Sequence, residues 1–216
     1  MTDAHPIGSF ILAGGASTRM GGDKSLLELA GETLIARTLH LLERCRLQPT
    51  MVGPREKFAG LALGAPVVAD DSPGLGPLGG IATALRHTRK SWNLILGCDL
   101  PFLTEDWIRY LIARATRVHK DAESRFDIVI PQNQGGLEPL CAMYHQRCVV
   151  AISAELDRGV RKVTAAFGGL RLDSILPEEW KAFDSGGLLF KNMNSPADYQ
   201  RAREILEGKS KGQRPN

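Results

Sequence analysis

The sequence predicts an α/β fold: a Rossmann-like, doubly wound, mostly parallel sheet with helices on both faces and a mixed C-terminal extension. Two observations predict it. Short apolar runs alternate with helix-like stretches along the first half of the chain, and turn residues follow each apolar run. Because ligands of such sheets bind at the carboxyl ends of the strands, the residues that follow each run are the first candidates for a functional site.

The apolar runs predict the strands of the parallel part, at residues 9–13, 50–53, 66–69 and 93–97. We expect helices at residues 33–44, around 56–61, and at 78–86 and 105–115. The first of these helices has an apolar face at helical spacing. The last begins after Thr104, a helix-capping residue that precedes an acidic first turn. Helices between successive strands would cover both faces of the sheet.

The C-terminal part alternates less regularly. We expect strands at 126–130, 140–144 and 188–191, a helix at 149–156, and a last helix that starts near Pro196. Neither a linker nor a repeat interrupts the chain, so we expect a single domain over residues 1–207. The remaining residues, 208–216, predict a disordered basic tail.

Composition excludes several classes of function. The formal net charge is +3, and Lys209, Lys211 and Arg214 of the tail account for it, so the body lacks the basic face of a nucleic-acid-binding protein. No run approaches the roughly 18 apolar residues of a membrane span. The four cysteines form no C-x-x-C pair, and no secretory signal precedes them, so we expect reduced thiols in a cytoplasmic protein. The histidines are scattered without the spacing of a zinc site.

A glycine-rich loop follows the first apolar run, with the sequence LAGGASTRMGGDKS at residues 12–25. Gly14 and Gly15 lack a Cβ, so their N–H groups can approach an anion closely. Arg19 adds a planar fork for phosphate oxygens, and Lys24 adds a compact charge. The combination predicts a triphosphate-binding loop. The alternative is a glycine turn whose cations point into water.

Carboxylates follow two other strands. Asp99 comes just after the run at 93–97, and Mg²⁺ with a nucleotide usually takes one or two carboxylates plus phosphate oxygens. We therefore expect Asp99 to be a metal ligand, although a turn aspartate that binds nearby backbone N–H groups is the alternative. Asp70 and Asp71 follow the third run, and for Asp71 we expect a solvated side chain.

The loop motif L-A-G-G-x-S-x-R-M-G-x-D-K resembles the signature of the molybdenum cofactor guanylyltransferases, within the wider nucleotidyltransferase superfamily. It is not a Walker loop, because Asp23 separates Gly22 from Lys24. Further matches are C-D-x-P from Cys98 and D-x-x-P-G-x-G-P-L-x-G from Asp70. Segments 138–144, 159–163 and 192–196 extend the resemblance over most of residues 9–200.

The resemblance implies roles for individual residues. Arg19, Lys24 and Asp99 would be the catalytic residues, and Asp99 would bind Mg²⁺. The nucleotide would bind Leu12, Ala13, Gly14, Gly15, Arg19, Lys24, Asp70, Gly79, Gly80 and Asp99. The acceptor would bind Arg161, Lys162, Asn192 and Asn194. Two alternatives stay open here: Arg161 and Lys162 suit a solvated helix face equally well, and Asn194 suits a helix cap before Pro196.

Together these residues predict a nucleotidyltransferase, and the resemblance supplies the substrates. It implies transfer of GMP from GTP to the terminal phosphate of molybdenum-molybdopterin, with release of pyrophosphate. It also implies contacts with molybdenum cofactor insertion proteins and molybdoenzyme-maturation partners. The family often has an asparagine after the second strand, where this chain has Gly53-Pro54-Arg55. CTP or another phosphate acceptor therefore remains an alternative, as does a non-catalytic nucleotide-binding protein that delivers the cofactor.

Overall fold

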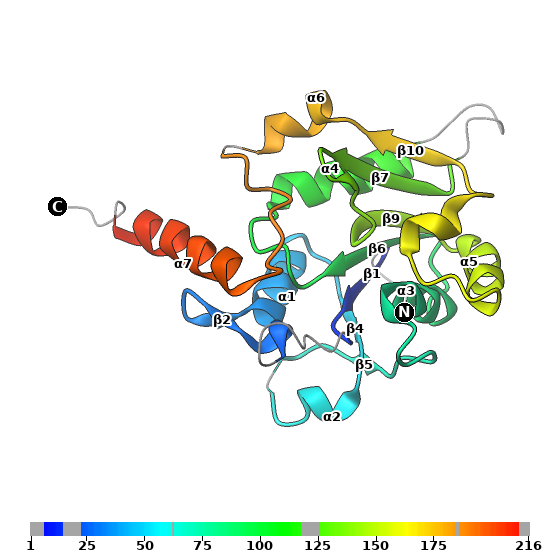
Figure 1. The fold of residues 1–216 in the computed structure, drawn as a ribbon, viewed down its shortest axis with the longest axis horizontal. Coiled ribbons are helices and arrows are strands. Elements are labelled where there is room, and N and C mark those ends of the chain that lie inside the picture. The colour runs from blue at the N-terminus through cyan, green and yellow to red at the C-terminus, as the bar shows by residue number, and fades with distance from the viewer. Residues whose placement is uncertain (1–6, 15–22, 62, 118–125, 185, 212–216) are drawn as a thin grey trace.

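A computed structural model describes residues 7–14, 23–61, 63–117, 126–184 and 186–211 of the chain. Its main sheet has the strand order β10-β7-β9-β6-β1-β4-β5, and β8 pairs with β7. The strands are β1 (Ile7–Leu12), β4 (Thr50–Val52), β5 (Val67–Val68), β6 (Trp92–Gly97), β7 (Ile128–Asn133), β8 (Gly136–Leu137), β9 (Cys141–His145) and β10 (Leu172–Ile175). Among them β9 runs antiparallel to both neighbours, β6 and β7. The predicted doubly wound, mostly parallel sheet is confirmed (Figure 1).

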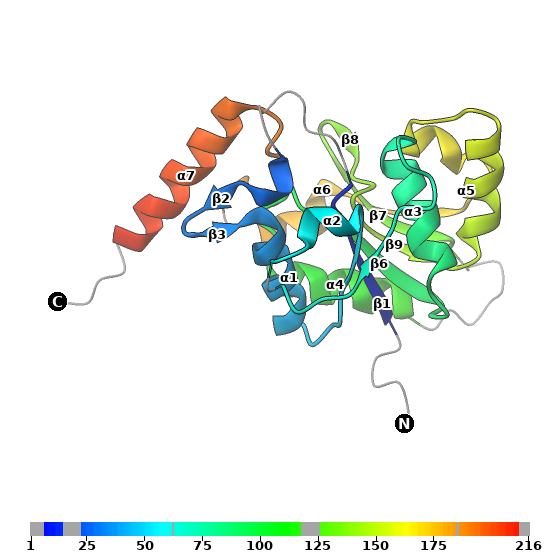
Figure 2. The same ribbon diagram turned by 90° about the horizontal axis from the view of Figure 1, so that it is seen from below.

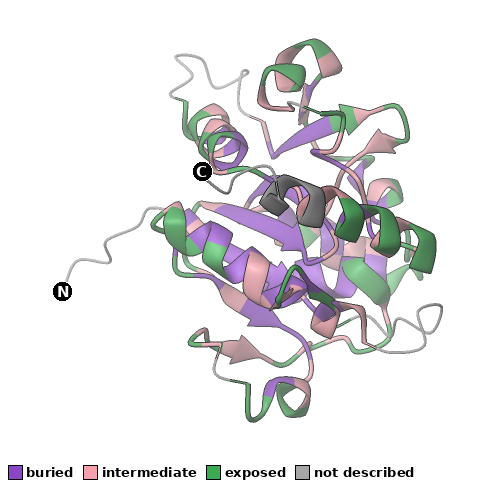
Figure 3. Ribbon diagram, turned by 90° about the vertical axis from the view of Figure 1, so that its left-hand side faces the viewer, coloured by how far each residue is buried: buried purple, intermediate pink, exposed green. Residues whose placement is uncertain are grey.

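The central strand β1 lies between β4 and β6 and pairs in parallel with both. Its neighbours align Leu12 with Val52 on one side and with Gly97 on the other. The carboxyl ends of these strands therefore meet at one edge of the sheet, where the residues of the predicted site follow them. Figure 3 shows that the central strands are mostly buried, whereas the helices expose their outer sides.

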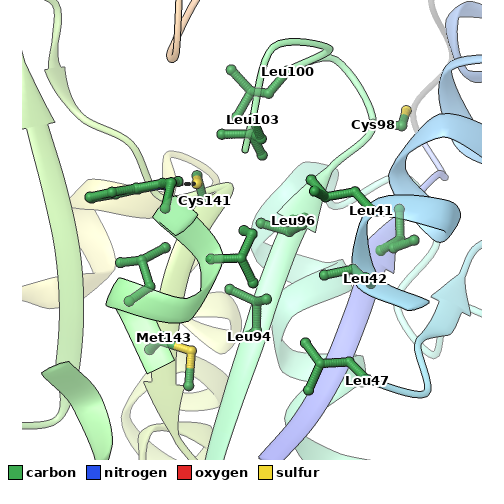
Figure 4. Close-up of a cluster of buried hydrophobic side chains, with 14 of the residues drawn as sticks. Leu41, Leu42, Leu47, Leu94, Leu96, Cys98, Leu100, Leu103, Cys141 and Met143 are labelled. Carbon is green, nitrogen blue, oxygen red and sulfur yellow. Dashed lines mark hydrogen bonds between the residues drawn. The ribbon is translucent and has the colours of Figure 1, made fainter. Parts of the chain in front are cut away.

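Helices cover both faces, as the alternation predicted (Figure 2). One face carries α1 (Leu34–Arg44) and α4 (Glu105–Thr116), and the other carries α3 (Gly76–Arg86) and α5 (Cys148–Asp157). Leucines of α1 pack on Leu94 and Leu96 of β6, and the Trp107 indole of α4 donates to Cys141 Sγ at 3.3 Å (Figure 4). Burial of such apolar side chains is the main contribution to the stability of the sheet–helix layers.

Capping residues fix where the two helices of the first face begin. Thr33 accepts from Ala36 N at 3.3 Å and Thr104 accepts from Trp107 N at 3.3 Å. Either contact satisfies a backbone N–H group that has no partner within the helix. The predicted cap at Thr104 is thus confirmed.

Shorter elements complete the chain. The helical pieces are η2 (Lys24–Leu26), α2 (Arg55–Phe58), η4 (Val163–Phe167), α6 (Pro177–Trp180) and η5 (Lys181–Phe183). A separate hairpin, β2 (Glu28–Leu29) with β3 (Glu32–Thr33), turns through Ala30 and Gly31, both with positive φ. The hairpin lies beside the final helix, α7 (Pro196–Lys211), in Figures 1 and 2.

One expectation for the C-terminal part was wrong. Residues 188–191 form a turn rather than a strand, because Asp184 Oδ1 accepts from Leu188 N and Leu189 N and Lys191 N donates to Leu188 O. The sheet gains β10 at its edge instead, paired with β7. The last helix starts at Pro196 as predicted and runs to Lys211, so it includes residues 208–211 of the predicted tail. Residues 212–216 lie outside the described residues.

The four cysteines all lie in the described part of the chain and are free thiols, as predicted. Among the described residues, no helix combines the length and the apolar character that crossing a membrane requires.

Candidate active site

A cavity of about 480 Å³ opens at the carboxyl ends of β1, β4 and β6. Its walls come from the segments that follow the parallel strands and from the start of α3, and they include Leu12, Ala13, Gly14, Asp23, Lys24, Ser25, Lys57, Asp70, Gly76, Gly80, Gly97, Cys98, Asp99 and Leu140. Most of the residues predicted to bind nucleotide therefore line one cavity. Gly15 and Arg19, which were also predicted there, lie outside the described residues.

Lys24 links the nucleotide side of this cavity to the predicted acceptor segment. Its ammonium donates to Asp99 Oδ2 at 2.9 Å and to Asn194 Oδ1 at 2.9 Å. The Lys24 and Asp99 side chains are only 14% and 22% exposed, so water screens the pair less than it screens a surface ion pair. Three residues far apart in the sequence thus meet at one point.

A glycine leaves room for the Asp99 carboxylate. A Cβ on Gly97, the last residue of β6, would lie 2.7 Å from Asp99 Oδ1, which is closer than carbon and oxygen approach without bonding. On the backbone side, Asp99 O accepts from Met193 N at 3.0 Å. The carboxylate is therefore held between the end of a buried strand and the segment before α7.

The donor set fits a cation that protein and nucleotide hold together. Among the described residues, no group of three or more His, Cys, Asp or Glu side chains could hold a metal ion. Asp99 offers a hard oxygen donor at the cavity wall, and Mg²⁺ in nucleotide sites commonly takes one or two carboxylates with phosphate oxygens and water. The predicted role of Asp99 as a metal ligand is compatible with this arrangement and stays a prediction.

Two ionisable groups beside Asp99 have raised pKa values. Burial, and next the Asp99 charge, raises the pKa of the Cys98 thiol to about 12, so Cys98 is a neutral thiol and a poor nucleophile at neutral pH. Burial also raises the pKa of Glu138. The hydrogen bond that the Asn133 amide donates to the Glu138 carboxylate, at 2.5 Å, has the opposite and smaller effect. Cys98 therefore does not supply the site with a reactive nucleophile.

The loop start and the loop end are joined by a residue that the sequence did not reveal. Lys57 of α2 donates to Ala13 O and lies 2.5 Å from Asp23 Oδ2. The other oxygen, Asp23 Oδ1, accepts from Ser25 N at 3.0 Å and from Ser25 Oγ at 2.8 Å. The only sequence signal for Lys57 is its place in the segment that follows the second parallel strand, where a site residue is expected.

Asp70 and the predicted glycines have clear structural contacts. Asp70 Oδ1 accepts from Ser72 N at 2.9 Å and from Thr83 Oγ1 at 3.0 Å, which fixes the carboxylate at the cavity wall. A Cβ on Gly80 would lie 3.2 Å from Leu12 Cδ1, and one on Gly79 would lie 3.0 Å from Ser72 O. Both glycines thus allow close packing of α3. Their approach to a nucleoside, like that of Asp70, stays a prediction.

Asp71 is 40% exposed at its side chain, and its carboxylate lies 3.3 Å from the His87 ring and 4.0 Å from the Arg86 guanidinium. This agrees with the solvated position that the sequence predicted.

The acceptor residues fall into two groups. Arg161 and Lys162 are exposed and do not line the described cavity, and Arg161 donates to the carbonyls of Leu156 and Val160 at the end of α5. Asn194, by contrast, touches Lys24. These contacts bring one predicted acceptor residue to the nucleotide side of the site.

Asn192 and Asn194 flank Met193, which is fully buried, so the segment alternates in direction as predicted, although no strand forms there. Asn194 does not cap α7. Ser195 does, because Ser195 Oγ accepts from Asp198 N at 3.2 Å and Asp198 Oδ2 accepts from Ser195 N at 3.0 Å.

Comparisons with known proteins find relatives over most of the chain. The family model of the MobA-like NTP transferase domain matches residues 9–173. A protein of Pelotomaculum thermopropionicum named probable molybdenum cofactor guanylyltransferase is 33% identical, over 94% of this chain and 94% of its own. A molybdenum cofactor guanylyltransferase of Vibrio atlanticus is 32% identical, over 87% and 91%. The crystal structure of molybdopterin-guanine dinucleotide biosynthesis protein A from Archaeoglobus fulgidus superposes with a TM-score of 0.76, at 26% identity, over 93% of this chain and 98% of that one.

Proposed function

This chain belongs to the MobA-like NTP transferase family, and from that premise we propose that it transfers GMP from GTP to the terminal phosphate of molybdenum-molybdopterin. The reaction would need Mg²⁺ and release pyrophosphate. Nucleotidyl transfer in molybdenum cofactor biosynthesis follows from the family and from relatives that match almost the whole chain. The nucleotide, the metal and the acceptor are the parts that we propose.

The observation that carries the proposal is the contact of the Lys24 ammonium with both Asp99 and Asn194, at 2.9 Å each. Lys24 belongs to the predicted triphosphate loop, Asp99 to the predicted metal site and Asn194 to the predicted acceptor segment. A group-transfer enzyme must bring these three functions together, because the acceptor has to reach the phosphate that the cation and metal hold. A protein that only stored a nucleotide would not need an acceptor segment at this point.

The residues present account for the charge changes of the reaction. An oxygen of the acceptor phosphate attacks the α-phosphorus of GTP, a new phosphoanhydride bond forms, and the bond to the β-phosphate breaks. Lys24, with Arg19 from the loop sequence, neutralises charge on the reacting phosphates. Asp99 would hold Mg²⁺, which supplies further charge neutralisation when bound. No general base is needed, because a phosphate monoester is already anionic at neutral pH.

The acceptor contacts proposed for Asn192 and Asn194 rest on position and chemistry. The Asn194 carboxamide lies beside Lys24, and amides both donate and accept hydrogen bonds, as the edge of a pterin requires. Arg161 and Lys162 have weaker support, since neither lines the cavity. We propose them only for the distal part of the acceptor.

A nucleotide panel tests the proposal. Purified protein with Mg²⁺ and molybdopterin is given GTP, CTP, ATP or UTP, and pyrophosphate release is measured. We expect release with GTP and at most slow release with the others. Faster release with CTP would support the cytidylyl alternative, which the absence of an asparagine after β4 favours. Binding of GTP without release would support a delivery protein.

A further inference from the structure

We propose that Lys57 is a positioning residue for the polyphosphate site: it holds Ala13 and Asp23 together and cancels the charge of Asp23 beside the nucleotide. The inference rests on the proposed function only in taking a nucleoside triphosphate as the ligand of the cavity. It concerns a residue that the loop motif does not contain.

Lys57 contacts both sides of the glycine-rich loop. Ala13 follows the end of β1, and Asp23 precedes η2, so in the sequence the two residues flank the stretch that carries Arg19. The Lys57 ammonium donates to Ala13 O and lies 2.5 Å from Asp23 Oδ2. Its side chain is only 12% exposed, and the ammonium lies 5.3 Å from the centre of the Phe58 ring. One buried cation therefore fixes the distance between the loop ends.

The contact between Lys57 and Asp23 also affects the position of Lys24. With Oδ2 held by Lys57, the Oδ1 atom of Asp23 accepts from both the backbone and the hydroxyl of Ser25 and so caps η2, whose first residue is Lys24. The cap sets the direction in which Lys24 leaves the backbone. Lys57 thus helps to place the ammonium that meets Asp99, although Lys57 itself lies on another element.

Charge gives Lys57 a second effect. Asp23 lines the cavity and its side chain is 30% exposed, so an uncompensated carboxylate there would repel the phosphates of a nucleotide. The Lys57 ammonium pairs with that carboxylate. Removing Lys57 should therefore weaken nucleotide binding partly through the Asp23 charge, and removing that charge as well should restore this part of the affinity.

The test compares Lys57→Met, Asp23→Asn and the double variant in the full chain. Calorimetric titration with GTP in Mg²⁺, without acceptor, gives Kd, and thermal melting gives stability. We expect Lys57→Met to weaken GTP binding by about 10- to 100-fold, the scale of one lost charge-assisted contact. The double variant should bind GTP at least about threefold more tightly than Lys57→Met, because the repulsion is gone, but more weakly than the parent, because Lys57 no longer holds Ala13 O. Arg55→Met, which removes an exposed cation from the same helix, is the matched control and should leave Kd unchanged.

Two outcomes overturn the inference. Parent-like GTP affinity in folded Lys57→Met would show that the contact does not position the site. A double variant as weak as Lys57→Met would show that Lys57 either binds the nucleotide itself or acts only through packing. If Lys57→Met does not fold, Lys57→Gln makes the same comparison, since its amide can still donate to Ala13 O but cannot cancel the Asp23 charge.

Nucleotide binding by the unsubstituted protein shows whether this inference or the proposed function has failed. If the parent binds CTP and not GTP, the choice of GTP fails, and the same comparison with CTP decides the role of Lys57. If the parent binds no nucleoside triphosphate, both fail.

Discussion

Replacement of Gly97 by alanine tests whether the position of the Asp99 carboxylate matters for the reaction. The added Cβ would lie 2.7 Å from Asp99 Oδ1 and 3.4 Å from Leu140 Cβ, so the carboxylate has to move by a large part of 1 Å. A misplacement of about 1 Å in a reacting group can cost roughly 100-fold in rate. Overpacking of this kind costs about 1 to 3 kcal/mol of stability. We therefore expect Gly97→Ala to fold and to lose about 100-fold in kcat.

The assay is pyrophosphate release from GTP with Mg²⁺ and molybdopterin, with urea unfolding to measure stability. Gly168→Ala is the matched control, because a Cβ there meets nothing within 4 Å, and it should change stability by less than about 0.5 kcal/mol. A folded Gly97→Ala variant with the parent's kcat would show that the Asp99 carboxylate can move without any effect on the reaction.

Four further substitutions test other parts of the site. Asp99→Asn keeps the shape but removes an anionic ligand, so pyrophosphate release should fall by at least about 100-fold with little change in melting temperature. Lys24→Ala should lower kcat by more than it weakens GTP binding, by about 1.5 to 3 kcal/mol or roughly 10- to 150-fold, since its charge matters most as the phosphates react. Asn192→Ala should raise KM for molybdopterin by the equivalent of about 1 to 3 kcal/mol and leave GTP binding unchanged in calorimetry. Ser195→Ala should lower the free energy of unfolding by about 0.5 to 2 kcal/mol, because it removes the cap of α7, and should leave kcat unchanged.

Each of these expectations has a contrary result. Near-normal turnover in folded Asp99→Asn would remove Asp99 from the metal site. A rise in KM for GTP alone in Lys24→Ala would make Lys24 a uniform binder. Unchanged acceptor kinetics in Asn192→Ala would count against the acceptor segment, and unchanged stability in Ser195→Ala would show that the cap contributes little.

The central parallel strands β1, β4 and β6 were predictable because most of their residues are buried. Such strands are continuous apolar runs between turn residues, as at 93–97. The same signal failed at 188–191, where Leu189 and Phe190 are buried but the backbone turns around the Asp184 side chain. An apolar run indicates burial, and the backbone conformation depends on which polar groups the neighbouring residues offer.

The edge strand β10 was not predicted, because it is not a continuous apolar run. β10 is short and carries Asp173, which is buried in a contact with Arg114 at 2.7 Å. A buried carboxylate is costly unless it is paired, and the pairing joins β10 to α4, far away in the sequence. The residues around β10 in the sequence therefore do not reveal that Asp173 has this partner.

For the site, too, the sequence predicts residues that belong to motifs but not contacts between distant elements. Gly14, Lys24, Asp70 and Asp99 were predictable because each belongs to a motif that follows a strand, and the carboxyl ends of those strands meet. Lys57 belongs to no motif, because its role depends on contacts with Ala13 and Asp23 across elements.

Following the α-phosphorus of GTP tests the proposed guanylyl transfer itself. GTP labelled at that atom is incubated with the protein, Mg²⁺ and molybdenum-molybdopterin, and the products are separated. We expect the label to appear in a pterin guanine dinucleotide, in equal amount to the pyrophosphate released, and Asp99→Asn to abolish its appearance. Label that stays in GTP, or a dinucleotide that forms only from CTP, would contradict the proposed transfer.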